Sequence, residues 1–249
     1  MRGLQGKTAV VTGGASGIGR ATCHRLAEEG CDVVVTDVDA AGGEETVRRI
    51  EADDAVGATA EFRHLDVSEY GEFEDVLFEA ADRHGGLDVL FNNAGVGEAR
   101  SFRETTPDHR DDLVEVNLYG VWNGCHAALP ILEEGDGGAI INTSSMAGWH
   151  PAPITTYAMT KAAVLHFTRS VAGEFARSGV RVNAVCPGLV STAMTDEWYS
   201  AEEREEMRRH TALGRWADPG EIAACVAFLA SEDASYVTGR AMKVDAGYV

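Results

Sequence analysis

The sequence is short of lysine: Lys7, Lys161 and Lys243 are the only three in 249 residues. Lysine and arginine together number 21 against 40 acidic residues, which gives a formal net charge of −19. So few cations cannot neutralise the phosphates of nucleic acid or of an anionic membrane, and the sequence argues against both partners. The acidic residues are spread along the chain as a solvated coat, so we expect a salt-loving source, with an acidic mesophilic protein as the alternative.

Paired cysteines and long apolar runs are also missing. Five scattered cysteines (Cys23, Cys31, Cys125, Cys186 and Cys225) form no C-x-x-C and have no histidine at metal spacing, so we expect reduced thiols and no metal site. No apolar run approaches the ~20 residues of a membrane span. The first six residues are too short and too polar for a signal peptide. We therefore expect a cytoplasmic protein.

Strand-like and helix-like patterns alternate along the whole chain. Strands are predicted over 7–12, 32–36, 59–65, 87–91, 138–142, 180–185 and 241–244, and helices over 17–29, 40–52, 69–84, 107–132, 155–177, 200–210 and 219–229. Short apolar strands separated by helices indicate βαβ crossovers. The predicted fold is α/β: a single domain over 1–249, with one Rossmann-type, doubly wound parallel sheet and helices on both faces. A loop at about 187–212 is expected to form the substrate pocket.

A glycine-rich turn follows the first strand. It reads Thr12-Gly13-Gly14-Ala15-Ser16-Gly17-Ile18-Gly19 and leads into a helix. Glycines in this position allow a tight turn and let a pyrophosphate approach the backbone amides at a helix N-terminus. The turn predicts dinucleotide binding, although a glycine-rich turn by itself can be no more than a turn.

The spacing T-G-x-x-x-G-x-G resembles that of the short-chain dehydrogenase/reductase family, in the compact branch whose chains have about 250 residues. Further matches follow in family order: Asp66-Val67, Asn92-Asn93-Ala94-Gly95, Asn117, Ser144-Ser145, Tyr157-x-x-x-Lys161, and Pro187-Gly188 through Thr192. The resemblance covers essentially the whole chain. It implies an enzyme that moves a hydride between a nicotinamide and an alcohol or carbonyl carbon.

The resemblance implies a catalytic set. Tyr157 would exchange a proton with the substrate oxygen, and Lys161, one helical turn later, would hold the nicotinamide ribose. A nearby ammonium and the positive oxidised nicotinamide are expected to lower the pKa of the tyrosine. One serine would hydrogen-bond the reacting oxygen. The S-x-x-G pattern typical of the family points to Ser145, whereas the usual interval between this serine and the tyrosine points to Ser144. We favour Ser145. Asn117 resembles the residue that anchors a water in the proton relay, with a core amide as the alternative.

Asp37 ends the second strand, where a carboxylate can accept hydrogen bonds from the adenosine ribose and would repel a 2′-phosphate. No basic residue stands at 38–40 or within the glycine turn, so we predict NAD as the cofactor; Asp37 can also cap the following helix. The resemblance adds cofactor contacts at Ile18, Asp66, Val67, Asn93, Val190 and Thr192. Asp66 can instead be a turn residue that closes its strand.

The substrate is not specified by the sequence. Sugars, polyols, simple secondary alcohols and hydroxyacyl thioesters all fit, and no pair of arginines marks a carboxylate or phosphate site. The residues expected near the pocket include Trp149, His150, Met194, Trp198 and Tyr199.

The alternative function is a non-catalytic protein that senses a dinucleotide. From the resemblance we expect a homotetramer, with helices 107–132 and 155–177 pairing across one axis and the last helix and closing strand through Val249 across another.

Overall fold

The computed structural model describes residues 1–53 and 56–248 of the chain. Its described strands form one parallel sheet in the order β3-β2-β1-β4-β5-β6-β7. The strands are β1 (Thr8–Thr12), β2 (Asp32–Asp37), β3 (Ala60–His64), β4 (Val89–Asn92), β5 (Gly138–Thr143), β6 (Val180–Pro187) and β7 (Ala241–Val244). The predicted doubly wound sheet is confirmed.

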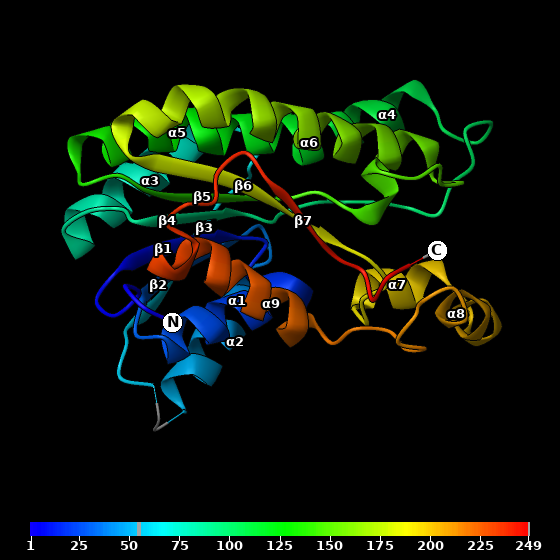
Figure 1. The fold of residues 1–249 in the computed structure, drawn as a ribbon, viewed down its shortest axis with the longest axis horizontal. Coiled ribbons are helices and arrows are strands. Elements are labelled where there is room, and N and C mark those ends of the chain that lie inside the picture. Colours follow the sequence, from blue (N-terminus) through cyan, green and yellow to red (C-terminus); the bar gives the residue numbers. More distant parts are fainter. Residues whose placement is uncertain (54–55, 249) are drawn as a thin grey trace.

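Helices cover both faces of this sheet (Figure 1). One face carries α3 (Tyr70–His84), α4 (Pro107–Val114), α5 (Gly120–Glu134) and α6 (Thr155–Phe175), and the other carries α1 (Gly17–Glu28), α2 (Ala40–Glu51) and α9 (Pro219–Ala230). Two short helices, α7 (Ala193–Trp198) and α8 (Ala201–Arg208), lie beyond one end of the sheet. No helix of the described residues is long and apolar enough to cross a membrane.

The central strands are buried because each is covered on both faces. All five residues of β1 and all four of β4 are buried, as expected for parallel strands between two helical layers. From β1 the chain runs outward through β2 to β3, and it then returns to β4 on the other side of β1. The connections after β1 and β4 therefore diverge. This is the switch point where ligands bind in doubly wound sheets.

The helical stretch predicted over 107–132 is present, but it is not one regular α-helix. The chain leaves α4 at Val114 and passes through a π-helical turn, η1 (Glu115–Tyr119), before α5 begins. The turn places Asn117 in the interior, where its side-chain amide accepts the N–H of Val96 and donates to the carbonyl of Val96, both over 2.8 Å. A buried amide needs such partners, and its two hydrogen bonds to Val96 compensate for the local departure from regular α-helical hydrogen bonding.

The predicted loop after β6 contains one more helix. α7 begins with a reciprocal cap in which Thr195 donates its N–H to the Thr192 hydroxyl and accepts the N–H of Thr192. The closing strand is β7, which ends at Val244; of the contact predicted through Val249, only Val249 itself lies outside the described residues.

Candidate active site

The glycine turn between β1 and α1 leaves a helix N-terminus open. Gly13 and Gly17 have φ angles of +67° and +50°, which glycine adopts without strain. α1 begins at Gly17 without a side-chain cap from Ser16 and without an acidic residue in its first turn. Gly13, Ser16, Gly17 and Ile18 line a cavity of about 440 Å³, which we call the glycine-turn cavity. Uncapped N–H groups beside a cavity suit an anionic ligand such as a pyrophosphate.

Asn93 fastens the glycine turn to the end of β4. Its backbone N–H donates to the Thr12 hydroxyl over 2.9 Å, and its side-chain amide donates to the carbonyl oxygens of Thr12 (2.9 Å) and Gly13 (3.3 Å). Gly19 packs beneath the turn, where a Cβ would collide with the Gly13 carbonyl. These contacts hold the turn in one conformation, which lowers the entropic cost of binding a ligand there.

Asp37 lies at the end of β2 and also lines the glycine-turn cavity. One of its carboxylate oxygens accepts the N–H of Ala15 and the other accepts the N–H of Asp39, each over 3.0 Å. The cap of α2 is Asp39, which accepts the N–H of Gly42 over 3.1 Å. Asp37 is therefore not the helix cap, and its carboxylate borders the cavity.

Arg20 is a residue that the motif analysis passed over. Its guanidinium donates to the carbonyl oxygens of Ala15 and Gly42 and to the Thr46 hydroxyl, which fixes the glycine turn against α2. Burial lowers the pKa of this arginine. Its position directly after Gly19 is the only signal that the sequence offers for this role.

The two candidate serines face different surroundings. The Ser144 hydroxyl is buried and donates to the carbonyl oxygen of Lys161 over 2.8 Å. Ser145 accepts the N–H of Ala147 over 3.1 Å, and its side chain lies beside Tyr157 in the same cavity wall, where it acts to lower the pKa of the phenol. The structure thus brings Ser145, and not Ser144, to the tyrosine hydroxyl.

The pKa of Tyr157 is raised to about 12, mainly because burial penalises the phenolate; the Ser145 side chain opposes this in part. The expected low pKa is therefore absent in the protein alone. Lys161 lies one turn away with its ammonium nitrogen 5.6 Å from the centre of the tyrosine ring. It is buried, donates to the carbonyl of Thr143 over 3.1 Å, and has its pKa lowered to about 8 by burial.

Asn117 and Lys161 converge on the segment after β4. A Cβ on Gly95 would lie 3.0 Å from the Asn117 side-chain oxygen and 3.3 Å from the Lys161 ammonium. Asn117 is fully buried and its nitrogen also approaches the Thr160 hydroxyl at 3.4 Å. It is a satisfied core amide that holds this segment beside the lysine.

The remaining predicted cofactor contacts also lie near this cavity. Asp66 lines the glycine-turn cavity while one of its oxygens accepts both the N–H and the hydroxyl of Ser68, so it is a turn residue as well. Val67 and Thr192 line the same cavity, whereas Val190 lines the neighbouring one. Thr143, which the motif analysis missed, borders both and has a buried hydroxyl without a hydrogen-bond partner in the described structure.

The neighbouring cavity, of about 470 Å³, is called here the outer cavity. It shares Tyr157 with the glycine-turn cavity, and its wall includes Ser145, Met146, His150, Leu189, Met194, Trp198, Tyr199, Glu203, Glu206, Met207 and Tyr248. The Trp198 ring packs edge-on against Tyr157, with centres 5.4 Å apart, and its N–H donates to the carbonyl of Gly97 over 3.2 Å. A mostly apolar wall beside a tyrosine–serine pair suits a small organic substrate.

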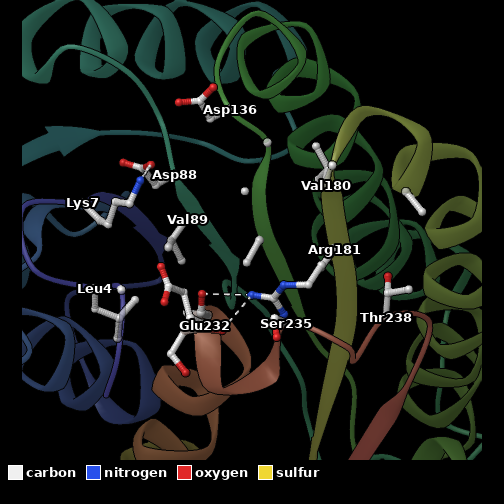
Figure 2. Close-up of a pocket in the computed structure, with 18 residues that line it drawn as sticks. Leu4, Lys7, Asp88, Val89, Asp136, Val180, Arg181, Glu232, Ser235 and Thr238 are labelled. Carbon is white, nitrogen blue, oxygen red and sulfur yellow. Dashed lines mark hydrogen bonds and ion pairs between the residues drawn. The ribbon is translucent and has the colours of Figure 1, made fainter.

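A hollow of about 500 Å³ opens at the opposite end of the sheet, where the strands begin (Figure 2). Arg181 points into it and donates to the backbone carbonyls of Leu229, Ala230, Ser231 and Val237. Lys7 is paired with Asp88 over 2.6 Å. The cations of this hollow are bonded within the protein, so we do not assign it a ligand.

Comparison with known proteins gives consistent matches over the whole chain. Residues 13–249 match the family model described as enoyl-(acyl carrier protein) reductase. The L-2,3-butanediol dehydrogenase of Corynebacterium glutamicum is 39% identical over 97% of this chain and 98% of its own length. The 3-oxoacyl-[acyl-carrier-protein] reductase of Thermotoga maritima is 35% identical over 99% of both chains.

A solved structure agrees in fold as well as in sequence. A short-chain type dehydrogenase/reductase from Mycobacterium marinum superposes with a TM-score of 0.93 and 30% identity, covering 99% of this chain and 96% of the other. The whole sheet with its helices is therefore shared.

Proposed function

This chain belongs to the short-chain dehydrogenase/reductase family of oxidoreductases, and we propose that it moves a hydride between NAD and the carbon of a secondary alcohol or ketone. The observation that carries the proposal is the meeting of Tyr157, Ser145 and Lys161 where the two cavities join. The butanediol dehydrogenase and the 3-oxoacyl reductase are named for substrates that share a secondary alcohol or a ketone.

Bound NAD would supply the hydride acceptor and a positive charge beside Tyr157. The residues that would hold it are Gly13, Ser16, Gly17, Ile18, Gly19, Asp37, Asp66, Val67, Asn93, Tyr157, Lys161, Val190 and Thr192. The open N-terminus of α1 and the fixed glycine turn support this assignment, because both are shaped for a pyrophosphate without rearrangement.

The proton moves at the Tyr157 oxygen. In oxidation the phenolate accepts the alcohol proton, and in reduction the phenol donates it to the carbonyl oxygen. Burial opposes the phenolate, so positive charge is needed beside it; the Lys161 ammonium is the protein's own contribution. Ser145 hydrogen-bonds the reacting oxygen and stabilises its developing charge. We also propose that Asn117 anchors a relay water, in addition to the contacts with Val96 and Thr160 that its side chain makes.

The preference for NAD rests on Asp37. Its carboxylate borders the glycine-turn cavity, where it would accept ribose hydroxyls and repel a 2′-phosphate. Arg20, the basic side chain near the turn, already donates to Ala15, Gly42 and Thr46 and is not free to bind a phosphate.

Two other functions can be distinguished from the proposed one. The matching family model is described by its enoyl reductases, but a lysine one turn after the tyrosine favours chemistry at C–O rather than C=C. A non-catalytic dinucleotide sensor would need no ordered Ser145–Tyr157 pair beside an apolar cavity. Screening secondary alcohols, polyols, sugars and hydroxyacyl thioesters with NAD, by absorbance of the reduced cofactor, tests the proposal. The sensor hypothesis predicts binding of NADH without turnover of any of them.

We further propose that segment 187–212 covers the substrate and that the protein is a homotetramer. α7 and α8 lie in this segment, and Met194, Trp198 and Tyr199 reach the outer cavity from it. Large apolar side chains are exposed on the helices assigned to the first interface: Trp122 on α5 is 45% exposed and Met159 on α6 is 50% exposed. A stable monomer in light scattering would contradict the tetramer.

A further inference from the structure

Trp198 joins three segments that lie far apart in the sequence. It is the last residue of α7, in the segment proposed to cover the substrate. Its ring packs edge-on against Tyr157 on α6, and its N–H donates to the carbonyl of Gly97 in the segment after β4. Among the described residues, Trp198 lines the outer cavity but not the glycine-turn cavity. A residue in this place can act on the tyrosine from the substrate side.

The backbone of Gly97 and the indole of Trp198 together close one side of the tyrosine ring. A Cβ on Gly97 would collide with the Trp198 ring and would lie 3.1 Å from the ring of Tyr157. Both rings therefore fit here because residue 97 has no side chain. Edge-on contact is also a favourable geometry for two aromatic rings. The tyrosine ring cannot turn toward this side unless the indole moves.

The rest of the segment holds the indole in place. The Tyr199 ring packs edge-on against both Trp198 and Trp216, with ring centres 6.2 Å and 6.1 Å apart. Arg204 on α8 places its guanidinium 4.3 Å from the centre of the Trp216 ring and forms an ion pair with Asp196 on α7. Trp216 in turn donates its ring N–H to the carbonyl of Arg204 over 3.0 Å. α7 and α8 are therefore connected through a row of rings that ends at the active-site tyrosine.

The indole also forms part of the environment of the phenol. Burial is the main reason that the pKa of Tyr157 is raised to about 12. The titratable groups that face this phenol are Lys161 on α6, with its ammonium 5.6 Å from the ring centre, and Tyr199 after α7, which raises the pKa. Ser145, after β5, acts to lower it, and Gly97 presents only backbone. An apolar ring against the tyrosine excludes water, so its removal should lower that pKa toward the ordinary 10.

We propose that Trp198 is a positioning residue: it holds the Tyr157 ring in its reacting orientation and fastens segment 187–212 to the segment after β4. The indole does not exchange a proton with the substrate, because its single N–H is bonded to Gly97. It acts through the tyrosine, where a displacement of about 1 Å can cost about 100-fold in rate. This role rests on the proposed function, since it requires Tyr157 to transfer a proton.

Steady-state kinetics of alcohol oxidation with NAD test the positioning role. Trp198→Ala removes both the ring and the N–H, whereas Trp198→Phe keeps a ring and loses the N–H. We expect kcat to fall about 100-fold in the alanine variant and about tenfold in the phenylalanine variant, with KM for NAD unchanged. The matched control is Phe102→Ala, which removes an aromatic side chain of the segment after β4 that is 72% exposed and should keep wild-type kcat.

The pH dependence separates positioning from a general loss of structure. Oxidation needs the phenolate, so its rate rises with pH through the apparent pKa of Tyr157. Trp198→Ala should move this midpoint about one unit to lower pH, and Trp198→Phe, which still shields the phenol, should leave it in place. A wild-type kcat in Trp198→Ala, an unmoved midpoint in that variant, or an equal loss of kcat in Phe102→Ala overturns the proposal.

Limited proteolysis tests the attachment of the segment without any turnover. Trypsin can cut segment 187–212 after Arg204, Arg208 and Arg209, and mass spectrometry identifies the cuts. Cleavage there should be about tenfold faster in Trp198→Ala than in wild type or Phe102→Ala, because the segment opens more often. Equal cleavage rates contradict the proposed attachment. If cleavage differs but wild type oxidises no alcohol, the proposed function fails and the attachment by Trp198 stands.

Discussion

The two ends of the sheet carry hollows of similar size, about 440 Å³ at the glycine turn and about 500 Å³ where the strands begin, yet they use their polar groups differently. At the beginning of the strands, Arg181 is saturated by backbone carbonyls and Lys7 by Asp88 (Figure 2). At the other end, the N-terminus of α1 is uncapped and the Thr143 hydroxyl has no described partner. Charge bonded within the protein stabilises the fold, whereas open donors and acceptors beside a cavity are available to a ligand.

The largest expected effect is at Tyr157. Replacing it with phenylalanine removes the proton donor, so turnover should fall by ~10²–10⁴-fold while NADH binding and melting temperature stay nearly unchanged. The matched control is Tyr236→Phe, a fully exposed tyrosine that should keep wild-type turnover. Tyr157→Phe with more than about a tenth of wild-type turnover would refute the proton-transfer role.

Arg181→Met should have the opposite effect: it should lower stability and leave turnover unchanged. It strips a charged donor from four backbone carbonyls, so the free energy of unfolding should fall by about 2–3 kcal/mol. KM and kcat of the folded fraction should not change, because this hollow lies at the far end of the sheet. Urea unfolding with Arg240→Met as the control measures the loss. If Arg181→Met instead changed KM for NAD and left the free energy of unfolding unchanged, a ligand would bind in the hollow where the strands begin, which contradicts the account.

Lys161 and Lys7 should change the free energy of unfolding in opposite directions as the pH rises. Burial lowers the pKa of Lys161 to about 8, below its ordinary 10.5, so from pH 8 to 10.5 the unfolded chain holds the extra proton and stability rises with pH. The slope is up to about 1.4 kcal/mol per pH unit for one proton. The pKa of Lys7 is raised by its hydrogen bond to Asp88, so its contribution is present below pH 10.5 and lost above.

Unfolding free energies of wild type, Lys161→Met and Lys7→Met test this contrast, from pH 8 to about 10.5 for Lys161 and above about pH 10.5 for Lys7. Subtracting Lys161→Met from wild type should leave a difference that shifts in favour of wild type as pH rises. A flat difference would mean that the lysine is not desolvated in the folded state.

Asp37→Asn tests cofactor choice at nearly constant volume. It weakens the ribose contacts and removes the charge that repels a 2′-phosphate, so kcat/KM for NAD should fall about tenfold and the preference over NADP should narrow. Asp75→Asn, at an exposed position on α3, is the charge-matched control. Equal kcat/KM for NAD and NADP in wild type would contradict the assignment.

Salt should act on the whole surface rather than on either end. At a net charge of −19 the folded chain repels itself when screening is weak; the Debye length falls from ~30 Å at 0.01 M to ~3 Å at 1 M. Melting temperature and activity should therefore rise from dilute buffer to molar KCl, with several salts compared at equal ionic strength. An unchanged melting temperature would remove the case for a salt-loving source and leave the active site unaffected.

The succession of strands and helices along the chain and many members of the glycine-turn cavity were predictable because their signals are local. A buried strand, a glycine turn and a helix follow one another directly in the sequence, and Tyr157 and Lys161 share one helix face. Ser144 and Ser145 were harder, because successive residues leaving a strand point in opposite directions and only the fold shows which one meets Tyr157.

Features assembled from distant segments were not predictable. Trp149, Arg169 and Lys243 contact one another although they are far apart in the sequence, so no local pattern predicts their contact. The π-helical turn at Asn117 was hidden because the surrounding apolar spacing remains helical, and the turn is fixed only by bonds to Val96 in another segment.

The central claim, that the Tyr157 end of the sheet transfers a hydride, is tested most directly by isotope transfer. Secondary alcohols that carry deuterium on the carbinol carbon are incubated with NAD and the purified protein, and the reduced cofactor is analysed by mass spectrometry. We predict that wild type and Arg181→Met transfer deuterium to the cofactor and that Tyr157→Phe does so only at a trace rate. Transfer by Tyr157→Phe at the wild-type rate, or none from any alcohol with wild type, would contradict the account.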